Sequence, residues 1–256
     1  DEQCCDWVEI LKPQPLRPGY PETRMHRFSS ANGTTNCTPA VTHVRVNLFP
    51  DGGIARLKLW GQVSVDFHKD LKGKYLDLAC ASNGGKGIGC SNQHYGEPDN
   101  LLKPTRGIDM RDGWETARHP NRPSIIRKDP TSGLVDTDLM DWCILRLGAV
   151  ADYVSKLIID TSHFKGNFPE SCFVEGCYYH QSEDSLCADA QWFPILNRTR
   201  LTAHAEHVFP NDCLVSGRKS VSHIRLSIYP DGGISRLRVF GTAKEPIRSA
   251  DTKSHL

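Results

Sequence analysis

One stretch of this chain occurs twice, and the duplication constrains the fold more than any other feature. Residues 41–61 read VTHVRVNLFPDGGIARLKLWG, and residues 221–241 read VSHIRLSIYPDGGISRLRVFG. At a constant offset of 180 residues, 11 of the 21 aligned positions are identical. Self-similarity over this length indicates an internal repeat. We therefore expect the chain to contain two copies of one folding unit.

Each copy has the pattern of a β-hairpin. Apolar residues alternate with polar ones, as in a strand with one buried face. A Pro-Asp-Gly-Gly turn follows, and the alternation then resumes. We predict that one face of each hairpin is apolar and that the other carries the cationic and His side chains. The apolar set is Val44, Val46, Leu48, Leu57 and Leu59, and, in the second copy, Ile224, Leu226 and Ile228.

The predicted outer face of the second hairpin carries His223, Arg225, Arg236 and Arg238. A solvated surface is the simplest interpretation, and we favour it for Lys58 and Arg238. His and Arg recur at the same two places in both copies, so a ligand or docking face is the alternative for His223 and Arg225.

Composition excludes some classes of protein. The chain has 31 Lys and Arg against 30 Asp and Glu, so no overall charge favours nucleic acid or an anionic membrane. No apolar run reaches the length of a membrane span. The ten cysteines are irregularly spaced, without a C-x-x-C, and four residues separate Cys172 from Cys177. This spacing suits neither a zinc ribbon nor a redox pair, and we predict mostly reduced, buried cysteines.

Further alignment suggests where each repeat begins and ends. Trp7 and the residues after it align with Trp192 and its successors, so residues 1–62 correspond to the last third of a repeat. We predict a complete second repeat at 75–242, a linker at 63–74 and a polar tail at 243–256. Short runs at 141–147, 154–160 and 172–174 read as strands, and long helical periodicity is lacking. These patterns predict an all-β sandwich.

Two polar segments of the second repeat hold candidate functional groups. The segment 110–120 contains Asp112, Trp114, Glu115 and Arg118, and the segment 160–169 contains His163 and Asn167. A structural interpretation stays open for both: an acid–Arg pair with the Trp as an apolar plug, and an ordinary turn. The glycine-rich run 83–89 satisfies neither phosphate-binding motif, and we expect a loop there.

Three segments together resemble one enzyme family. DGWETAR at 112–118, DTSHFKGNFPESC at 160–172 and the duplicated H-[VI]-R-x-x-[LI]-[FY]-PDGG-I-[AS]-R-L pattern are similar to those of allantoicases, over nearly the whole chain. The resemblance implies tandem galactose-binding-like jelly-roll β-sandwich repeats, the first one incomplete here. It also implies hydrolysis of the small molecule allantoate to ureidoglycolate and urea in purine degradation.

A mechanism can be outlined from that substrate. Expelling urea needs a proton at the leaving nitrogen and an activated water. Glu115 and Asp112 are the candidate acid–base pair, with His163 as the alternative base. Arg118 or Arg225 would bind the substrate carboxylate, and Asn167 a ureido carbonyl. We also count Trp114 and His223 among the substrate-binding residues. No ligand cluster stands out, so we predict no metal or cofactor while leaving a divalent metal open.

Other functions compete with this one. The chain could be an inactive family member, a carbohydrate-binding module or, least favoured, a nucleotide-binding enzyme. The family carries a DGWET-type motif in each repeat and only the second is present, so we expect little activity from this chain alone. Ser254-His255-Leu256 resembles a peroxisomal address, which predicts the peroxisomal matrix, with the cytoplasm as the alternative. We expect no nucleic-acid or membrane partner and leave a homo-oligomer open.

Overall fold

A computed structural model describes residues 7–28, 40–61, 63–179 and 187–247. The chain divides into two compact units, Asp1–Trp60 and Gly61–Leu256, which are described separately. Within the described ranges, no helix has the length and apolar character needed to cross a membrane.

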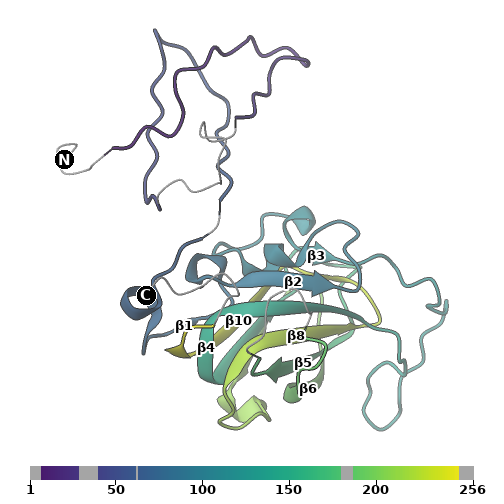
Figure 1. Cartoon of the computed structure of the whole chain (residues 1–256). Helices are drawn as coiled ribbons and strands as arrows, with labels where there is room; N and C mark the ends of the chain where they lie inside the picture. Colours follow the sequence, from purple (N-terminus) through teal and green to yellow (C-terminus); the bar gives the residue numbers. More distant parts are fainter. Residues whose placement is uncertain (1–6, 29–39, 62, 180–186, 248–256) are drawn as a thin grey trace. The chain divides into compact units, whose positions relative to one another are not determined.

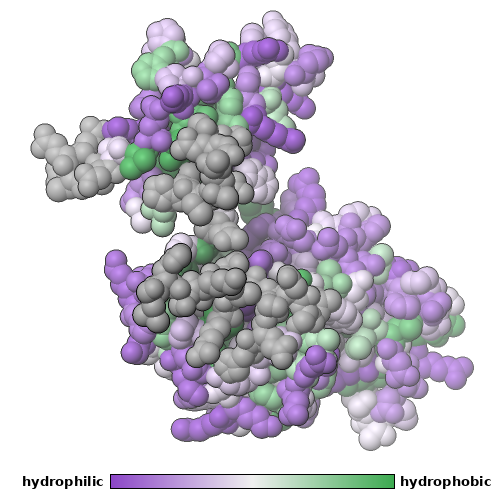
Figure 2. Space-filling model, in the orientation of Figure 1, coloured by the Kyte–Doolittle hydropathy of each residue, from purple (hydrophilic) through white to green (hydrophobic). Residues whose placement is uncertain are grey.

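The first unit forms turns and bends but no strand in its described residues. The hairpin predicted for 41–61 is therefore wrong for the first copy. Its apolar side chains are exposed, with Leu57 at 55% and Trp60 at 90% of their full accessible area, and apolar side chains show on the surface of this unit in Figure 2. A two-stranded hairpin is marginal in water without a further apolar layer, and the described part of this unit provides no such layer.

The regular secondary structure of the second unit consists mainly of β-strands, which confirms the all-β prediction. Short helical turns lie between the strands. Its helical turns are η2 (Phe67–Leu71), η3 (Ala81–Asn83), η4 (Pro98–Leu102), η5 (Met110–Asp112) and η7 (Asn211–Cys213). Its strands are β1 (Tyr75–Asp77), β2 (Lys86–Cys90), β3 (Trp114–Glu115), β4 (Asp141–Asp160), β5 (Ser171–Cys177), β6 (Phe193–Arg200), β7 (Glu206–Pro210), β8 (Val221–Tyr229), β9 (Gly233–Ile234) and β10 (Arg236–Glu245).

The long strand β4 connects the parts of the main sheet, whose order is β1-β10-β4-β8-β5-β6. The first part of β4 pairs with β2 and β8, and its last part pairs with β7 and β10. The register shifts between Arg146 and Ala151, where β4 passes from one set of partners to the other. The two strands predicted at 141–147 and 154–160 are thus one strand, drawn as a long teal ribbon in Figure 1.

The second copy forms the strands β8, β9 and β10, but the predicted hairpin is wrong here too, because β4 lies between β8 and β10 in the main sheet and β9 pairs with β3. Ile224, Leu226 and Ile228 are fully buried in the main core, as predicted. His223 and Arg236 are buried as well, with 3% and 2% of their area exposed, so the prediction that they face outward is wrong. A second apolar cluster covers His223, and backbone carbonyls surround the Arg236 guanidinium.

Other expectations need correction. The solvated position expected for Arg238 is wrong, because its side chain is largely buried and its Nε lies 3.5 Å from Asp77 Oδ2. The glycine-rich run 83–89 is not a simple loop, since it contains most of β2. Part of the segment expected as a linker packs on the second unit, where Leu71 of η2 lies in the core. Five of the seven described cysteines are buried, and all seven are free, in keeping with the prediction.

Candidate active site

Three segments that are far apart in the sequence meet at one edge of the second unit. The short strand β3 of the DGWET segment pairs with β9, with Glu115 opposite Gly233. The Gly233 amide donates a 2.8 Å hydrogen bond to the Asn167 carbonyl. The turn of the second copy therefore lies between the two polar segments that were singled out in the sequence.

The two glycines of this turn allow the close approach. Gly232 has φ of +140°, which favours glycine. A Cβ there would lie 2.7 Å from the Asn167 carbonyl oxygen, and a Cβ on Gly233 would lie 1.9 Å from Phe164 Cε1. The Pro-Asp-Gly-Gly sequence of the second copy thus does more than form a turn. It brings the two polar segments together.

Glu115 and Asn167 are in direct contact. The Asn167 side-chain amide donates a hydrogen bond to Glu115 Oε1, and the same amide lies 3.8 Å from Met110 Sδ. Both side chains are half-buried. In this arrangement the Glu115 carboxylate can give or take a proton, and the carboxylate and the Asn167 amide can both hydrogen-bond a urea-like group. The structure therefore joins two of the residues that the sequence predicted for the site.

The contacts of Trp114 and Asp112 indicate that both residues support the fold. Trp114 is fully buried in the main core, and its Nε1 donates a 2.9 Å hydrogen bond to the Asn92 carbonyl. Asp112 lies 2.7 Å from Arg236 NH2 and 2.5 Å from Lys103 Nζ. Burial raises the pKa of Asp112, but the hydrogen bonds from Lys103 and Arg236 outweigh it and lower the pKa to about 2. Asp112 is therefore ionised at neutral pH and suits positioning of Arg236 better than proton donation.

His163 and Arg118 lie in the two segments but without a contact to Glu115. The His163 ring nitrogen Nε2 is 2.9 Å from the Gly107 carbonyl, and the ring packs edge-on against His204. Arg118 is exposed and has no hydrogen-bond or ion-pair partner among the described residues. It remains available to an anionic ligand.

His223 and Arg225 do not join this site. They lie within β8, where Arg225 NH2 is 2.6 Å from Glu175 Oε2 and its guanidinium stacks over Trp192. His223 is buried against Tyr179, Cys177 and Cys187 of the second apolar cluster. Burial, followed by the nearby charge of Arg146, lowers the pKa of His223 to about 4. The alternation along β8 could not show that other elements cover this face of the strand.

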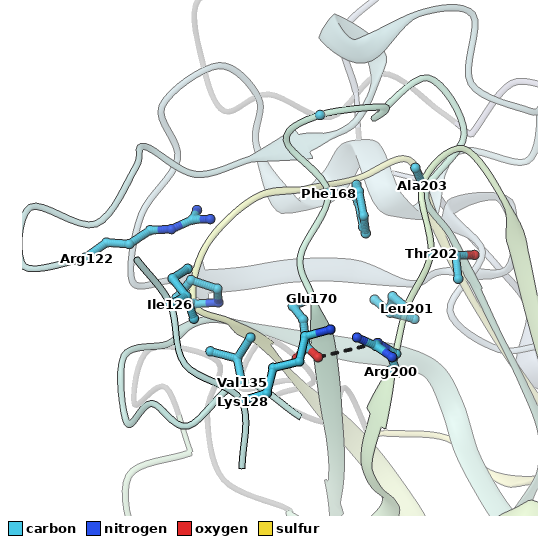
Figure 3. Close-up of a pocket in the computed structure, with 12 residues that line it drawn as sticks. Arg122, Ile126, Lys128, Val135, Phe168, Glu170, Arg200, Leu201, Thr202 and Ala203 are labelled. Carbon is cyan, nitrogen blue, oxygen red and sulfur yellow. Dashed lines mark ion pairs between the residues drawn. The ribbon is translucent and has the colours of Figure 1, made fainter. Parts of the chain in front are cut away.

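Sequence reasoning missed a cavity of about 440 Å³ beside the 160–169 segment. Gly166 and Phe168 line it, whereas Asn167 between them contacts Glu115. Arg122, Lys128, Glu170 and Arg200 also line it, and Figure 3 shows the ion pair between the last two, with Arg200 Nε 3.6 Å from Glu170 Oε1. Both Glu170 carboxylate oxygens are buried without a hydrogen-bond partner in the described residues. The only signal in the sequence was that Glu170 belongs to the DTSHFKGNFPESC motif.

Asp231 was a second omission. This buried carboxylate of the turn accepts a 2.9 Å hydrogen bond from the His119 amide and lies 2.5 Å from Arg122 NH1. It ties the turn to the chain that follows the DGWET segment. Because its counterpart Asp51 is exposed, the repeat alone could not have revealed this role.

The fold and the site define a β-sandwich unit with a cluster of polar loops at one edge. Comparison with known families is more specific: residues 1–64 and 76–244 match the family described as allantoicase repeat. The chain belongs to this family. The match covers both copies of the duplicated segment.

Relatives and solved structures agree with this assignment. A probable allantoicase of Pseudomonas syringae pv. tomato is 42% identical over 92% of this chain, and one of Photobacterium profundum is 37% identical over 94%. The crystal structure of allantoicase from Saccharomyces cerevisiae has a TM-score of 0.51 and 35% identity, covering 67% of this chain and 44% of that one. The chain spans 63% and 65% of the lengths of the two bacterial relatives, which is less than two thirds.

Proposed function

We propose that this chain contributes the substrate site of an enzyme that hydrolyses allantoate to ureidoglycolate and urea. Family membership supports this assignment. The observation that carries it is the contact between Glu115 and Asn167, which joins two family-like motifs through residues 52 positions apart. A carboxylate beside an amide suits a substrate whose ureido groups both donate and accept hydrogen bonds.

In this proposal Glu115 is the proton-transfer group. The leaving urea nitrogen must gain a proton as its bond to carbon breaks, and a water must lose one. The Asn167 amide holds the Glu115 carboxylate and can bind a ureido carbonyl once substrate displaces part of that contact. Asp112 acts indirectly, by positioning Arg236 through the ion pair between them. His163 stays an alternative base, at a position 4 residues before Asn167.

The substrate carboxylate needs a cationic partner, and the structure offers two places where one is present. Arg118 follows Glu115 by 3 residues and is exposed without a protein partner in the described part of the chain. The cavity on the other side of the 166–168 segment presents Arg122, Lys128 and Arg200. A guanidinium binds a carboxylate through paired hydrogen bonds, so Arg118→Ala and Arg200→Ala variants can show which site the substrate uses.

Binding and turnover are tested separately. Calorimetric titration of allantoate into the chain should show saturable binding, which Asn167→Ala weakens by about tenfold through the loss of a partly buried hydrogen bond. Glu115→Gln should retain binding but abolish ureidoglycolate formation in a coupled assay. Glu206→Gln is the matched control, because Glu206 is an exposed glutamate of β7 outside the site. Absence of allantoate binding, or a measurable turnover of the unsubstituted chain that Glu115→Gln leaves unchanged, would refute the proposal.

Turnover by this chain alone should be low even if binding is normal. The described residues of the first unit form no strand, and we propose that the first repeat contributes to the complete enzyme. Binding without turnover would fit this account, as well as the alternative of a family member that has lost activity. Binding of galactose in place of allantoate would instead favour a carbohydrate-binding module.

We also propose import into peroxisomes. The support is the tripeptide Ser254-His255-Leu256, a variant of a known address signal that lies outside the described residues. A fluorescent protein ending in residues 243–256 should collect in peroxisomes. A diffuse cytosolic signal would contradict this proposal and favour the cytoplasm.

A further inference from the structure

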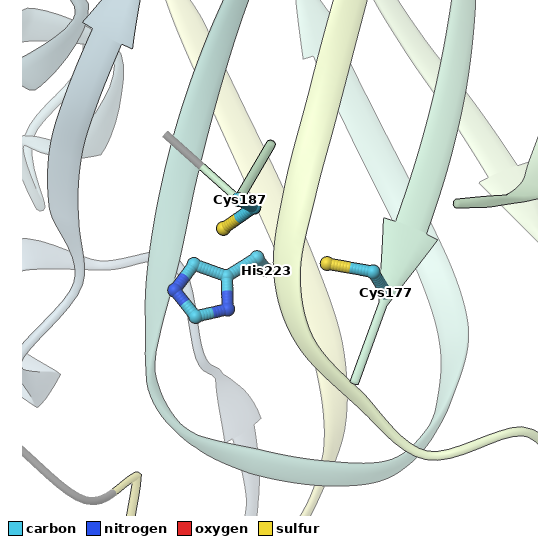
Figure 4. Close-up of side chains that lie close together, drawn as sticks. All are labelled: Cys177, Cys187 and His223. Carbon is cyan, nitrogen blue, oxygen red and sulfur yellow. The ribbon is translucent and has the colours of Figure 1, made fainter. Parts of the chain in front are cut away.

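Three side chains of metal-binding type meet on the face of β8 opposite the main core. Cys177 ends β5 and is the direct cross-strand partner of His223 on β8. Cys187 approaches from the chain that returns toward β6. All three are buried, and one ligand atom from each lies within 4.8 Å of the others. Figure 4 shows the two sulfur atoms on either side of the His223 side chain.

The spacing suits a shared cation. Zinc takes thiolate sulfur at about 2.3 Å and imidazole nitrogen at about 2.0–2.1 Å, so ligand atoms of one ion lie roughly 3.5–3.8 Å apart. The three ligand atoms lie within 4.8 Å of one another, so binding would require the side chains to move closer to reach that spacing. Two thiolates and one neutral imidazole are a soft ligand set, which selects zinc and copper(I) over magnesium or calcium.

Neighbouring groups hold the imidazole in place. The Ser222 hydroxyl lies 2.8 Å from His223 Nδ1 and also accepts a 2.8 Å hydrogen bond from the Tyr179 amide. The Tyr179 ring packs edge-on against the imidazole, with centroids 6.0 Å apart. Trp142 and Trp192 pack against the same cluster. Such outer contacts orient ligands in metal sites and exclude competing conformations.

Two other interpretations are weaker. Buried cysteines are often plain apolar residues, as Cys172 in the main core illustrates, but Cys172 has no partner of metal-binding type in the groups found among the described residues. A Cys177–Cys187 disulfide would leave a buried histidine beside it without a role. The cross-strand placement of Cys177 and His223 instead presents two ligands from one rigid sheet face.

We propose that Cys177, Cys187 and His223 form a structural site for a thiophilic cation, with Zn²⁺ as the ion to test. Binding releases two thiol protons, so the two thiolates neutralise the charge of the ion. The ion would link Cys187, in the chain before β6, to Cys177 of β5 and His223 of β8. Three protein ligands leave one coordination position for water. This site is distinct from the Glu115 loops and carries no part of the proposed reaction.

The test uses Co²⁺ as a spectroscopic probe in the reduced, metal-free chain. We expect a thiolate-to-cobalt charge-transfer band that saturates at one equivalent and disappears when Zn²⁺ is added. Cys187→Ser should lose the band, whereas Cys213→Ser, which changes an exposed cysteine, should retain it. Zn²⁺ should also raise the melting temperature of the unsubstituted chain, a readout that does not depend on whether a variant folds.

Three results would overturn the proposal. One is the absence of a cobalt band in the folded, reduced chain. Another is a band of equal strength in Cys187→Ser, which would place the metal on other cysteines. The third is recovery of the chain with Cys177 and Cys187 joined in a disulfide, with no metal binding after reduction. Failure here would leave the allantoate proposal untouched, because the two sites share no residue.

Discussion

The two copies of the duplicated segment have nearly the same sequence pattern and different structures. Both turns place their first glycine at positive φ, +130° at Gly52 and +140° at Gly232. Only the second copy forms strands, β8 pairing with β4 and β5, and β10 with β1 and β4. The turn is thus encoded locally, whereas the strands depend on neighbours. The alternating pattern therefore forms strands only where other strands pair with it, and even there β4 separates β8 from β10, so the copy is not a hairpin.

The equivalent glycines show the same contrast. A Cβ on Gly53 would meet nothing within 4 Å, whereas one on Gly233 would overlap the Phe164 ring. The same holds for Gly61 and Gly241, the latter lying against Tyr153. Identical residues therefore have a conformational role in one copy and a packing role in the other. Matched substitutions at positions 180 residues apart can measure the difference.

The largest difference in stability is expected when Arg56 and Arg236, which occupy equivalent positions of the two copies, are substituted. Arg56 is exposed, whereas Arg236 is buried, lies 2.7 Å from Asp112 and donates to the Thr105, Asp112 and Ser235 carbonyls. Removing one member of a buried pair costs about 3–5 kcal/mol. Arg236→Ala should lower the free energy of unfolding by that amount in urea denaturation, and Arg56→Ala by less than about 0.5 kcal/mol. Equal effects would mean that the first copy is packed like the second.

Substitution of the equivalent glycines Gly53 and Gly233 should give a smaller difference in stability, again with the larger loss in the second copy. Gly233→Ala must displace the Phe164 ring, and overpacking of this kind costs about 1–3 kcal/mol. Gly53→Ala has open space around it and should be neutral or slightly stabilising. Denaturant midpoints of the two variants, compared at an unchanged slope, measure the effect. A neutral Gly233→Ala would show that the turn does not pack on the 160–169 segment.

Low pH should destabilise the second unit, because protonation of Asp112 removes its ion pair with Arg236. Its folded pKa of about 2 lies below the ordinary value of 3.8, so its contribution to stability is present above about pH 4 and is lost as pH falls toward 2. Because the carboxylate is partly exposed, we expect a loss of about 1–2 kcal/mol. Unfolding free energies measured between pH 5 and pH 2 should fall less steeply for Asp112→Asn, which has no such proton to gain. An unchanged slope in this variant would contradict the assignment.

The sequence predicted local features well. Ile224, Leu226 and Ile228 are buried because alternation reports which face of a strand is apolar. The plug-like burial of Trp114 was among the stated alternatives and is what the structure shows. Alternation does not report what covers the polar face. For that reason His223 and Arg236 were misassigned to solvent, and β4 was read as two strands where one crosses between two sets of partners.

The candidate site was predictable only in part. The contact between Glu115 and Asn167 joins residues that had been selected from separate motifs. Arg225 was selected by its place in the repeat, yet it is paired with Glu175 on another face. Asp231, Glu170 and the cluster of Cys177 with His223 depend on contacts between distant segments. No pattern along the chain encodes such contacts, so they could not be inferred before the fold was known.

Amide hydrogen exchange of the monomeric chain tests the central claim most directly. The two copies of the duplicated segment can be followed in one sample as separate peptides. We predict strong protection of residues 221–241, whose amides belong to paired strands inside the sheet, and exchange close to that of an unfolded chain for residues 41–61. Equal protection of the two segments would contradict the account, because it would mean that the first copy forms stable strands without the neighbouring strands that pair with the second.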